Sequence, residues 1–374
     1  MKKILLLIFC IPFIGVAQQT YVPDDNFEQE LINLGYDNVL DDYVNTSSID
    51  TITFLNIGSN GNIIDLTGIE EFTLLEYLNC GGNQIVSLDV SSNLRLKQLY
   101  CDFNQIQTLL INDSLEALDC NNNLLSNLNL NNGKSLYIVD CSFNLITSIS
   151  LDSCSSLNLF SCKENQLDSL DISNTDIYSL DCSNNLLIDL ILNDSIVGVN
   201  SEENLLQNVD LSNLDKLGVA RFSSNQLTTV NTQGAISLGY LDVSNNQFID
   251  LDISILSNLQ TLLCWSNQLA SLDLKNGNNI NMSIDVTSNP NLDCISVDDT
   301  SWAITNWTVS NNNIDPQHFF STNCNTTNIE EFQSETKLLK IVDVLGREVP
   351  PTKNTPLLYI YENGRVEKKI LVEG

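Results

Sequence analysis

Seven cysteines of the chain recur in almost the same short string, of which LDCNNNLL (118–125) and LDCSNNLL (180–187) are two examples. A series of thiols suggests disulfides, a metal site or a reactive nucleophile. Zinc-binding cysteines come in close pairs such as CxxC, whereas consecutive cysteines in the first six copies are 19–21 residues apart. The seven positions are Cys80, Cys101, Cys120, Cys141, Cys162, Cys182 and Cys264.

A structural role fits these cysteines better than a disulfide, a metal site or a reactive nucleophile. In four further copies the same place holds Ser201, Phe222, Val243 and Val286, which indicates a position that faces a core. Adjacent parallel strands would hold the Cβ atoms about 4.8 Å apart, beyond the ~3.5–4.5 Å of a disulfide. We therefore predict a ladder of buried, protonated and unreactive thiols, and we expect Cys154 to pack in the core too. A metal shared by stacked thiols is the alternative, but it would lack a tetrahedral cage.

Other residues give little sign of catalysis. The chain has one histidine, His318, in a segment rich in aromatic residues, where packing explains it. The motifs GxSxG, HExxH, CxxC and the phosphate-binding loop are all missing from the sequence. We expect no cofactor and no enzyme activity. Acid–base hydrolysis by a pair of carboxylates stays open as a third hypothesis of function.

The cysteines belong to a repeat with the frame LxxLxCxxNxLxxLxL. Its asparagine returns in steps of 19–22 residues, and a degenerate first copy around Asn60 brings the number of coils to twelve. The side-chain amide of a turn asparagine can bond backbone groups, so this asparagine is expected to form a structural ladder. The other eleven positions are Asn83, Asn104, Asn123, Asn144, Asn165, Asn185, Asn204, Asn225, Asn246, Asn267 and Asn289.

The spacing of the apolar residues dictates a stacked solenoid. LxxLxL turns alternate side chains inward on a short strand, and the second xLxxLxL segment closes the coil on the far side. One coil cannot bury its own apolar edge, so the coils must stack. The predicted fold is β-rich, with one parallel strand per coil over residues 50–297.

This frame resembles the leucine-rich repeat, and its 21-residue form with cysteine in the sixth place is similar to the internalin J type of bacterial surface protein. The resemblance covers about residues 50–297. It implies a leucine-rich repeat solenoid with a parallel sheet on its concave face and suggests adhesion as a class of function. The cysteine is replaced in four copies, so it is not obligatory in the frame.

The N-terminus and the charge narrow the possible partners. Residues 1–17 have two lysines, an apolar run and small residues before Gln18, as in a signal peptide, although a membrane anchor is an alternative reading. No later apolar run approaches the ~20 residues of a membrane helix, so we expect no transmembrane segment in the mature chain. A net charge of -31 repels phosphate backbones, so a nucleic-acid partner is not expected.

Both ends of a solenoid need caps. Residues 18–49 form the predicted N-terminal cap, with a helix that Asp25 caps, Glu28 supports and Gly35 ends, and with Phe27 and Leu31 on one face. Residues 298–324 form the predicted C-terminal cap, in which four aromatic residues cover the last coil. Cys294 and Cys324 bracket that segment and are expected to form a disulfide, with two free thiols as the alternative. The four aromatic residues are Trp302, Trp307, Phe319 and Phe320.

The C-terminal part differs in composition from the acidic body. Residues 325–334 read as a linker, and residues 335–374 carry seven Lys or Arg against six Asp or Glu. Three strands are predicted there, the last two joined at Asn363–Gly364. The segments IVDVLGREV and YIYENGRVEKKILVEG resemble the sorting tail of proteins exported by the type IX secretion system of Bacteroidetes. That resemblance implies passage through the outer membrane with the type IX machinery as partner. A small structural β-domain is the alternative.

The outward positions of the strands are the candidate binding surface. Exposed aromatic residues in a row favour contact with a protein or a glycan. An acidic series runs between them, and it is solvated or selects a basic partner; no calcium-loop spacing occurs, so we assign no metal. We predict an exported adhesin or protein-binding module, with carbohydrate binding in glycan foraging as the alternative. The candidate residues are Tyr77, Tyr100, Phe103, Phe143, Leu159, Arg221, Tyr240, Leu263 and Trp265.

Overall fold

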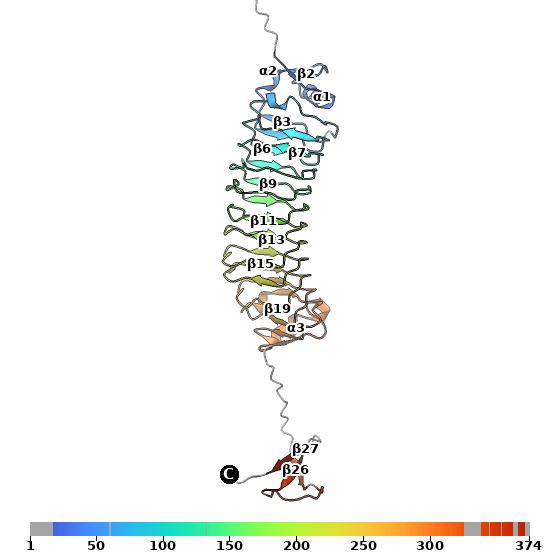
Figure 1. The fold of residues 1–374 in the computed structure, drawn as a ribbon, viewed down its shortest axis with the longest axis vertical. Coiled ribbons are helices and arrows are strands. Elements are labelled where there is room, and N and C mark those ends of the chain that lie inside the picture. The colour runs from blue at the N-terminus through green and yellow to red at the C-terminus, as the bar shows by residue number, and fades with distance from the viewer. Residues whose placement is uncertain are drawn as a thin grey trace, which may run out of the picture. The chain divides into compact units, whose positions relative to one another are not determined.

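The computed structural model describes residues 18–59, 61–131, 133–324, 338–343, 345–352, 354–361 and 366–370. The expected signal peptide (1–17), the expected linker (325–334) and Asn60 lie outside these residues. The chain divides into two compact units, of which the first ends at Thr322 and the second begins at Asn323. Figure 1 shows the first unit as a stack of coils.

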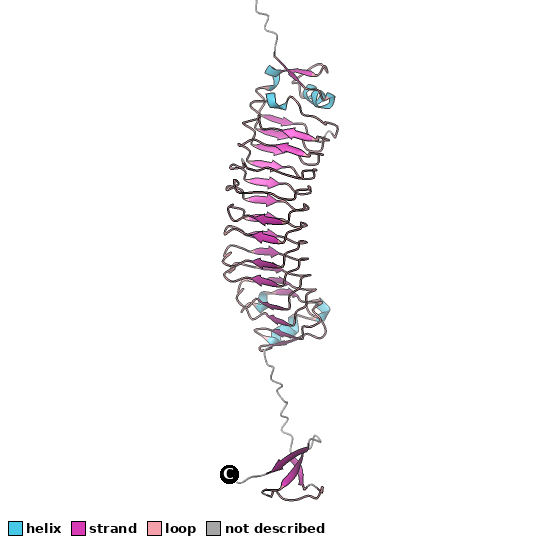
Figure 2. Ribbon diagram, viewed as in Figure 1, coloured by secondary structure: helices cyan, strands magenta, loops and turns pink. Residues whose placement is uncertain are grey.

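One side of the first unit is a continuous parallel sheet of twelve strands, one from each coil (Figures 1 and 2). Its middle residues point inward and are buried, and the flanking residues point outward, as the frame predicts. The outward side of this sheet is the concave face. The strands are β3 (Phe54–Asn56), β4 (Tyr77–Asn79), β6 (Gln98–Tyr100), β8 (Ala117–Asp119), β9 (Ile138–Asp140), β10 (Leu159–Ser161), β12 (Ser179–Asp181), β14 (Gly198–Asn200), β16 (Val219–Arg221), β18 (Tyr240–Asp242), β20 (Thr261–Leu263) and β22 (Ser283–Asp285).

The far side of the coils, which we call the back face, also contains strands. They form separate parallel sheets of two, two, two and four strands, with interruptions between them. Pairing that is continuous on one side and interrupted on the other fits coils that spread apart at the back. The strands are β5 (Ser87–Asp89) with β7 (Thr108–Leu110), β11 (Ser169–Asp171) with β13 (Asp189–Ile191), β15 (Asn208–Asp210) with β17 (Thr229–Asn231), and β19 (Asp250–Asp252) with β21 (Ser271–Asp273), β23 (Cys294–Ser296) and β24 (Phe319–Ser321).

The frame asparagine joins each coil to the one before it. The amide nitrogen of Asn144 donates to the carbonyl of Cys141 in its own coil at 3.1 Å and to that of Cys120 in the preceding coil at 3.0 Å. Its amide oxygen accepts from the backbone N–H of Leu125, again in the preceding coil, at 2.9 Å. The same arrangement recurs at Asn165 and at Asn289, where the bond from the backbone N–H of Leu269 is longer, at 3.2 Å. The side chain therefore satisfies buried backbone groups that the turn would leave unpaired.

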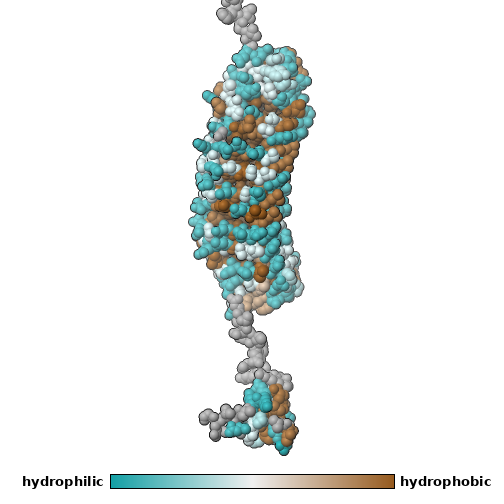
Figure 3. Space-filling model, in the orientation of Figure 1, coloured by the Kyte–Doolittle hydropathy of each residue, from teal (hydrophilic) through white to brown (hydrophobic). Residues whose placement is uncertain are grey.

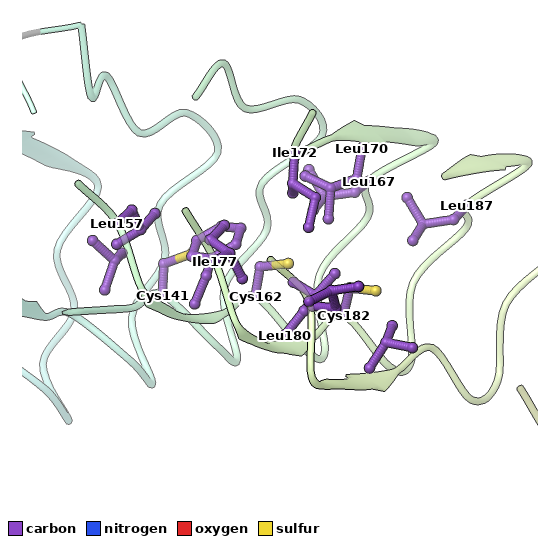
Figure 4. Close-up of a cluster of buried hydrophobic side chains, with 14 of the residues drawn as sticks. Cys141, Leu157, Cys162, Leu167, Leu170, Ile172, Ile177, Leu180, Cys182 and Leu187 are labelled. Atoms are coloured by element: carbon purple, nitrogen blue, oxygen red, sulfur yellow. The ribbon is translucent and has the colours of Figure 1, made fainter. Parts of the chain in front are cut away.

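The core is a continuous column of apolar side chains that includes the cysteines (Figure 4). Eight cysteines, the seven of the frame and Cys154, are free and buried. Burial raises the pKa of Cys80 and of Cys182 to about 12 and that of Cys154 to about 11. A thiol with so high a pKa is protonated at neutral pH and is a poor nucleophile.

The helix predicted near the N-terminus is present, but two of the roles predicted for its residues are wrong. Residues 18–49 contain β1 (Gln19–Tyr21), α1 (Asp25–Asn33), β2 (Tyr43–Asn45) and α2 (Thr46–Ile49), and β1 pairs antiparallel with β2. The short helix η1 (Ile69–Glu71) lies between β3 and β4. The residue that caps α1 is Asp24, not Asp25, because the carboxylate of Asp24 accepts from the N–H groups of Asn26 and Phe27. Glu28 does not complete a capping box. Its buried carboxylate accepts from three backbone N–H groups at residues 41–43 instead.

Residues 298–324 contain α3 (Thr300–Asn306), η3 (Val309–Asn311) and β24, and η2 (Asn279–Asn281) precedes β22 in the last coil of the sheet. Trp307 is buried, and Trp302 and Phe320 pack partly buried against the core. The prediction for Phe319 was wrong, because this side chain is 55% exposed. Phe319 and Phe320 are neighbours in β24, so their side chains point to opposite sides of the strand.

The second unit contains an antiparallel sheet of three strands, β25 (Leu338–Val342), β26 (Pro356–Tyr361) and β27 (Val366–Ile370). Its strands lie in the three segments predicted from the sequence, whereas the predicted turn at Asn363–Gly364 lies outside the described residues. Among the residues that the structure describes, no helix is both long enough and apolar enough to cross a membrane.

The thiol ladder predicts a definite reactivity. Folded protein should react negligibly with a thiol reagent at pH 8, because the buried sulfurs are protonated and inaccessible. In denaturant, protein that lacks residues 1–17 should present eight reactive thiols and one disulfide. Counting the labelled sites by mass spectrometry measures both states. Fewer than eight thiols in denaturant, or rapid labelling of the folded protein, would contradict the ladder.

Candidate functional site

Six of the nine predicted face residues occupy outward positions of the twelve-stranded sheet. Tyr77, Leu159 and Tyr240 begin β4, β10 and β18, and Tyr100, Arg221 and Leu263 end β6, β16 and β20. Phe103, Phe143 and Trp265 lie in the turns that follow the strands and are exposed. The nine residues share one side of the coils but extend over many strands, so they do not form one compact cluster. Figure 3 shows apolar residues among hydrophilic ones along one side of the first unit.

An aromatic group lies at the N-terminal end of the concave face. The rings of Phe54 and Tyr77 are stacked with centroids 4.4 Å apart, and the ring of Tyr100 lies 5.4 Å from that of Tyr77. Phe54 is 56% exposed and was not predicted as a face residue. The signal was available, because Phe54 precedes Leu55 in the degenerate first coil just as Tyr77 precedes Leu78 in the second.

A second group lies further along the sheet. The guanidinium of Arg221 lies 5.0 Å from the ring centroid of Tyr240, on the neighbouring strand, a cation–π contact. The amine of Lys163 makes the equivalent contact with Phe143, also at 5.0 Å. These contacts hold two cations over rings on a strongly acidic protein.

Two phenylalanines occupy a backbone position that suits them poorly. The residue before the frame asparagine has a positive φ, and this is 48° at Phe103 and 54° at Phe143. Other coils place glycine, asparagine, serine or glutamate here, as at Gly82, Asn184, Ser224 and Glu203, and of the non-glycine residues asparagine tolerates this conformation best. Phe103 is 60% exposed, so burial does not offset the strain. An exposed aromatic side chain kept at a strained position points to a function.

The acidic series has a structural role in the turns. The carboxylates of Asp140, Asp181 and Asp242 accept the backbone N–H two residues further on, at 2.9, 3.1 and 2.9 Å. The same bond occurs on the back face at Asp171 and Asp252. Because both faces have these aspartates, they do not by themselves mark a binding surface.

One carboxyl of the acidic series has a shifted pKa. Burial, together with the charges of Asp102 and Asp140, raises the pKa of Asp119 to about 6. On the back face the pKa of Asp210 is lowered instead, because the backbone N–H of Ser212 stabilises its carboxylate. At Asp119, burial and the two neighbouring charges therefore disfavour the charged form, whereas a hydrogen bond favours it at Asp210.

Potential catalytic and metal-binding groups are occupied by structural contacts. His318 is buried in the C-terminal cap, where its Nδ1 accepts from the N–H of Asp315 and its Nε2 lies 3.4 Å from the carbonyl of Asn289. Among the described residues, Asp25, Glu28 and Asp42 place carboxylate oxygens within 4.8 Å of one another. Glu28 already accepts backbone N–H groups there, so we assign no metal to this cluster. Cys294 and Cys324 are both disulfide-bonded.

Comparisons with known proteins show the fold. No family model matches the chain, and no curated protein matches it. The chain is similar to an internalin, InlF, from Listeria monocytogenes, at 22% identity and a TM-score of 0.54 over 76% of this chain and 93% of that one. It is also similar to YopM, a leucine-rich effector protein from Yersinia pestis, at 24% identity and a TM-score of 0.51 over 66% of this chain and 79% of that one. The fold is that of leucine-rich repeat proteins.

A third similarity concerns the repeat type. The functional domain of InlJ from Listeria monocytogenes, which includes a cysteine ladder, matches at 19% identity over 96% of this chain and 99% of that one. Its TM-score is 0.42, which is too low to support a closer relation than the shared repeat fold. The resemblance to the internalin J type therefore stays a prediction.

The pKa of Asp119 predicts a pH dependence of stability. Folding raises this pKa from 3.8 to about 6, so the folded state binds a proton that the unfolded state releases, and stability falls as the pH rises from about 4 to 6. Asp119→Asn removes the ionisable group and with it this loss of stability. The gain in the free energy of unfolding over the unchanged protein should therefore be larger at pH 8 than at pH 4. Urea unfolding at both pH values measures the difference.

Asp210→Asn is the matched control for this experiment. The pKa of Asp210 is lowered in the folded state, so its charge contributes stability that is present above the unfolded pKa and is lost as the pH falls. This variant should therefore lose stability at pH 8. If Asp119→Asn has the same effect at pH 4 and at pH 8, the perturbed carboxyl is not Asp119.

Proposed function

We propose that this chain is an exported, non-enzymatic recognition protein that binds a protein partner through its concave face, with adhesion at the cell surface as the class of function. The observation that carries the proposal is Phe103, a solvent-exposed phenylalanine at a φ of 48°. Such a conformation costs on the order of 1–3 kcal/mol. Contact with a partner explains why the position holds an aromatic residue rather than asparagine.

The aromatic group favours a protein partner over a glycan. Sugars stack on the open face of an aromatic ring, but Phe54 and Tyr77 stack on each other with an interplanar angle of 12°. Each ring therefore has one face covered by its neighbour. Protein interfaces use the edges and apolar area of such aromatic anchors well. Carbohydrate binding in glycan foraging is the alternative that the experiment below tests.

A binding role also fits the chemistry of the described residues. The buried thiols are protonated, and the only histidine is held in the cap by backbone groups. The outward side chains of a sheet with one short strand per coil form a broad surface, which suits a macromolecular partner. We propose no cofactor and no enzyme activity, and the hydrolase hypothesis gains no support from these contacts.

We propose export by a signal peptide at residues 1–17, followed by type IX secretion through the C-terminal tail at 335–374. The separate second unit with its three-stranded sheet supports a tail that functions independently of the solenoid. The proposed organisation between these ends is a cap at 18–49, a solenoid at 50–297, a second cap at 298–324 and a linker at 325–334.

The proposal predicts opposite effects of one substitution on stability and on binding. Phe103→Asn should raise the free energy of unfolding by about 1 kcal/mol, because asparagine tolerates positive φ, and should weaken binding to the partner at least about tenfold. Glu203→Asn is the matched control, since Glu203 holds the same turn position at a φ of 53°. It should be stabilising without any loss of binding.

The unchanged protein and three variants, Phe103→Asn, Tyr77→Ala and Glu203→Asn, are compared on a protein microarray and a glycan array. We expect protein ligands whose signal falls in Phe103→Asn and in Tyr77→Ala and is unchanged in Glu203→Asn. Ligands found only on the glycan array would favour the carbohydrate alternative. Protein ligands that bind all three variants equally would show that the concave face is not the binding surface.

A further inference from the structure

The back face is unpaired over two successive coils in the middle of the first unit. Residues 127–129 and 148–150 correspond in the frame to the strands β7 and β11 on either side of them, but they form no strand. Within the described residues, no backbone hydrogen bond joins residues 127–131 to residues 148–150. Among the described residues, the backbone groups of 127–131 and 148–150 that have a hydrogen-bond partner are the Leu130 carbonyl, which accepts from the N–H of Gly133 and from the thiol of Cys154, and the N–H of Asn131, which donates to the side chain of Asn129.

A cavity lies between these two segments. Its volume is about 290 Å³, and residues 127–131 and 148–150 line it. The buried side chains of Leu128 and Leu130 belong to the core beneath it. All the lining side chains are asparagine, serine, leucine or isoleucine, so none is charged, on a chain with a net charge of -31. At ~30 Å³ for each water, the space holds roughly ten waters, and it is at the small end of the range for binding sites.

We propose that this cavity binds an extended segment of a partner polypeptide, which adds to the back face as a parallel β-strand and points an uncharged side chain into the cavity. Elsewhere in the same frame the back-face segments pair in this way, as Ser169 does with Asp189 and Leu170 with Leu190. Unpaired backbone N–H and C=O groups such as those of the two segments are the groups that recognition by strand addition uses. This surface is separate from the concave face.

The lining chemistry selects the ligand. A charged side chain would lose hydration in the cavity without gaining a counter-charge, so the side chain that points into the cavity is uncharged, whereas side chains on the other side of the bound strand face solvent. A peptide main chain satisfies backbone groups on both of its edges, whereas a sugar is bound with the help of an aromatic platform. Among the lining residues there is no aromatic side chain. The geometry therefore favours a peptide of about three bound residues, which spans ~10 Å.

The probe is the synthetic hexapeptide ASLDLK, which is residues 270–275 of this chain and has one negative and one positive side chain. It contains β21, which pairs in parallel with β19 on one edge and with β23 on the other. The control peptide ASPDLK replaces its first leucine by proline, which removes a backbone N–H and disfavours a central strand. Hydrogen exchange of the full chain is measured with each peptide at saturating concentration.

We expect ASLDLK to slow amide exchange in residues 127–129 and 148–150 at least about tenfold, and ASPDLK to leave it unchanged. Ser148→Trp fills the cavity and should abolish the effect. Ser169→Trp is its matched control, because Ser169 is exposed at the same frame position in β11, where the backbone is already paired. This variant should keep the effect.

Three results would overturn the proposal. The first is exchange in these segments that ASLDLK does not slow. The second is equal slowing by ASPDLK, a comparison that needs no variant and so does not depend on whether Ser148→Trp folds. The third is slowing by a neutral disaccharide such as maltose and not by the peptide, which would make the cavity a sugar site. The experiment with Phe103→Asn tests binding at the concave face, which is a different surface. Its outcome does not change what the exchange experiment says about the cavity.

Discussion

The asparagine at each corner of the coil is the interaction on which the rest of the first unit depends. At Asn144 its amide donates to three carbonyls and accepts from one N–H, and two of these four backbone groups belong to the preceding coil. Leaving such a buried group unpaired costs about 1–3 kcal/mol. The bonds fix the distance and the register between coils, so the concave strands pair without interruption. Where the chain leaves the back face, amides of this kind bridge only some of the coils, as at Asn93, Asn112 and Asn193 among the described residues, and the back-face strands divide into short sheets.

Because the corner asparagine holds the coils together, the inward and outward residues of each coil have different roles. An inward position needs only an apolar side chain whose volume fits the core. This explains why cysteine, valine and phenylalanine occupy the same frame position in different coils. It also explains the cysteines without any reactive role for their thiols. Outward positions are free of that constraint. The residues that repeat in every coil therefore stabilise the fold, and we expect recognition to depend on residues that vary between coils, such as Tyr77, Phe103 and Arg221.

The sequence predicts the repeat, the inward residues and the twelve concave strands, because a strict period in apolar residues leaves one stacking arrangement. It does not predict the back-face strands or the gap at residues 127–129, since these depend on how far neighbouring coils spread apart. It places the helix cap one residue late, because Asp24 and Asp25 are chemically alike and only the backbone geometry distinguishes them. The strain at Phe103 cannot be predicted from the sequence either, because it is recognised only from the φ angle of that residue.

The most direct test of the asparagine ladder is the free energy of unfolding of Asn144→Ala compared with that of Asn127→Ala, whose side chain is exposed on the back face. Chemical denaturation followed by circular dichroism measures both. Asn144→Ala should lose on the order of 3 kcal/mol, because several buried backbone groups lose their partner, and Asn127→Ala should be within about 0.5 kcal/mol of the unchanged protein. Equal stability of the two variants would contradict the view that this side chain holds the coils together.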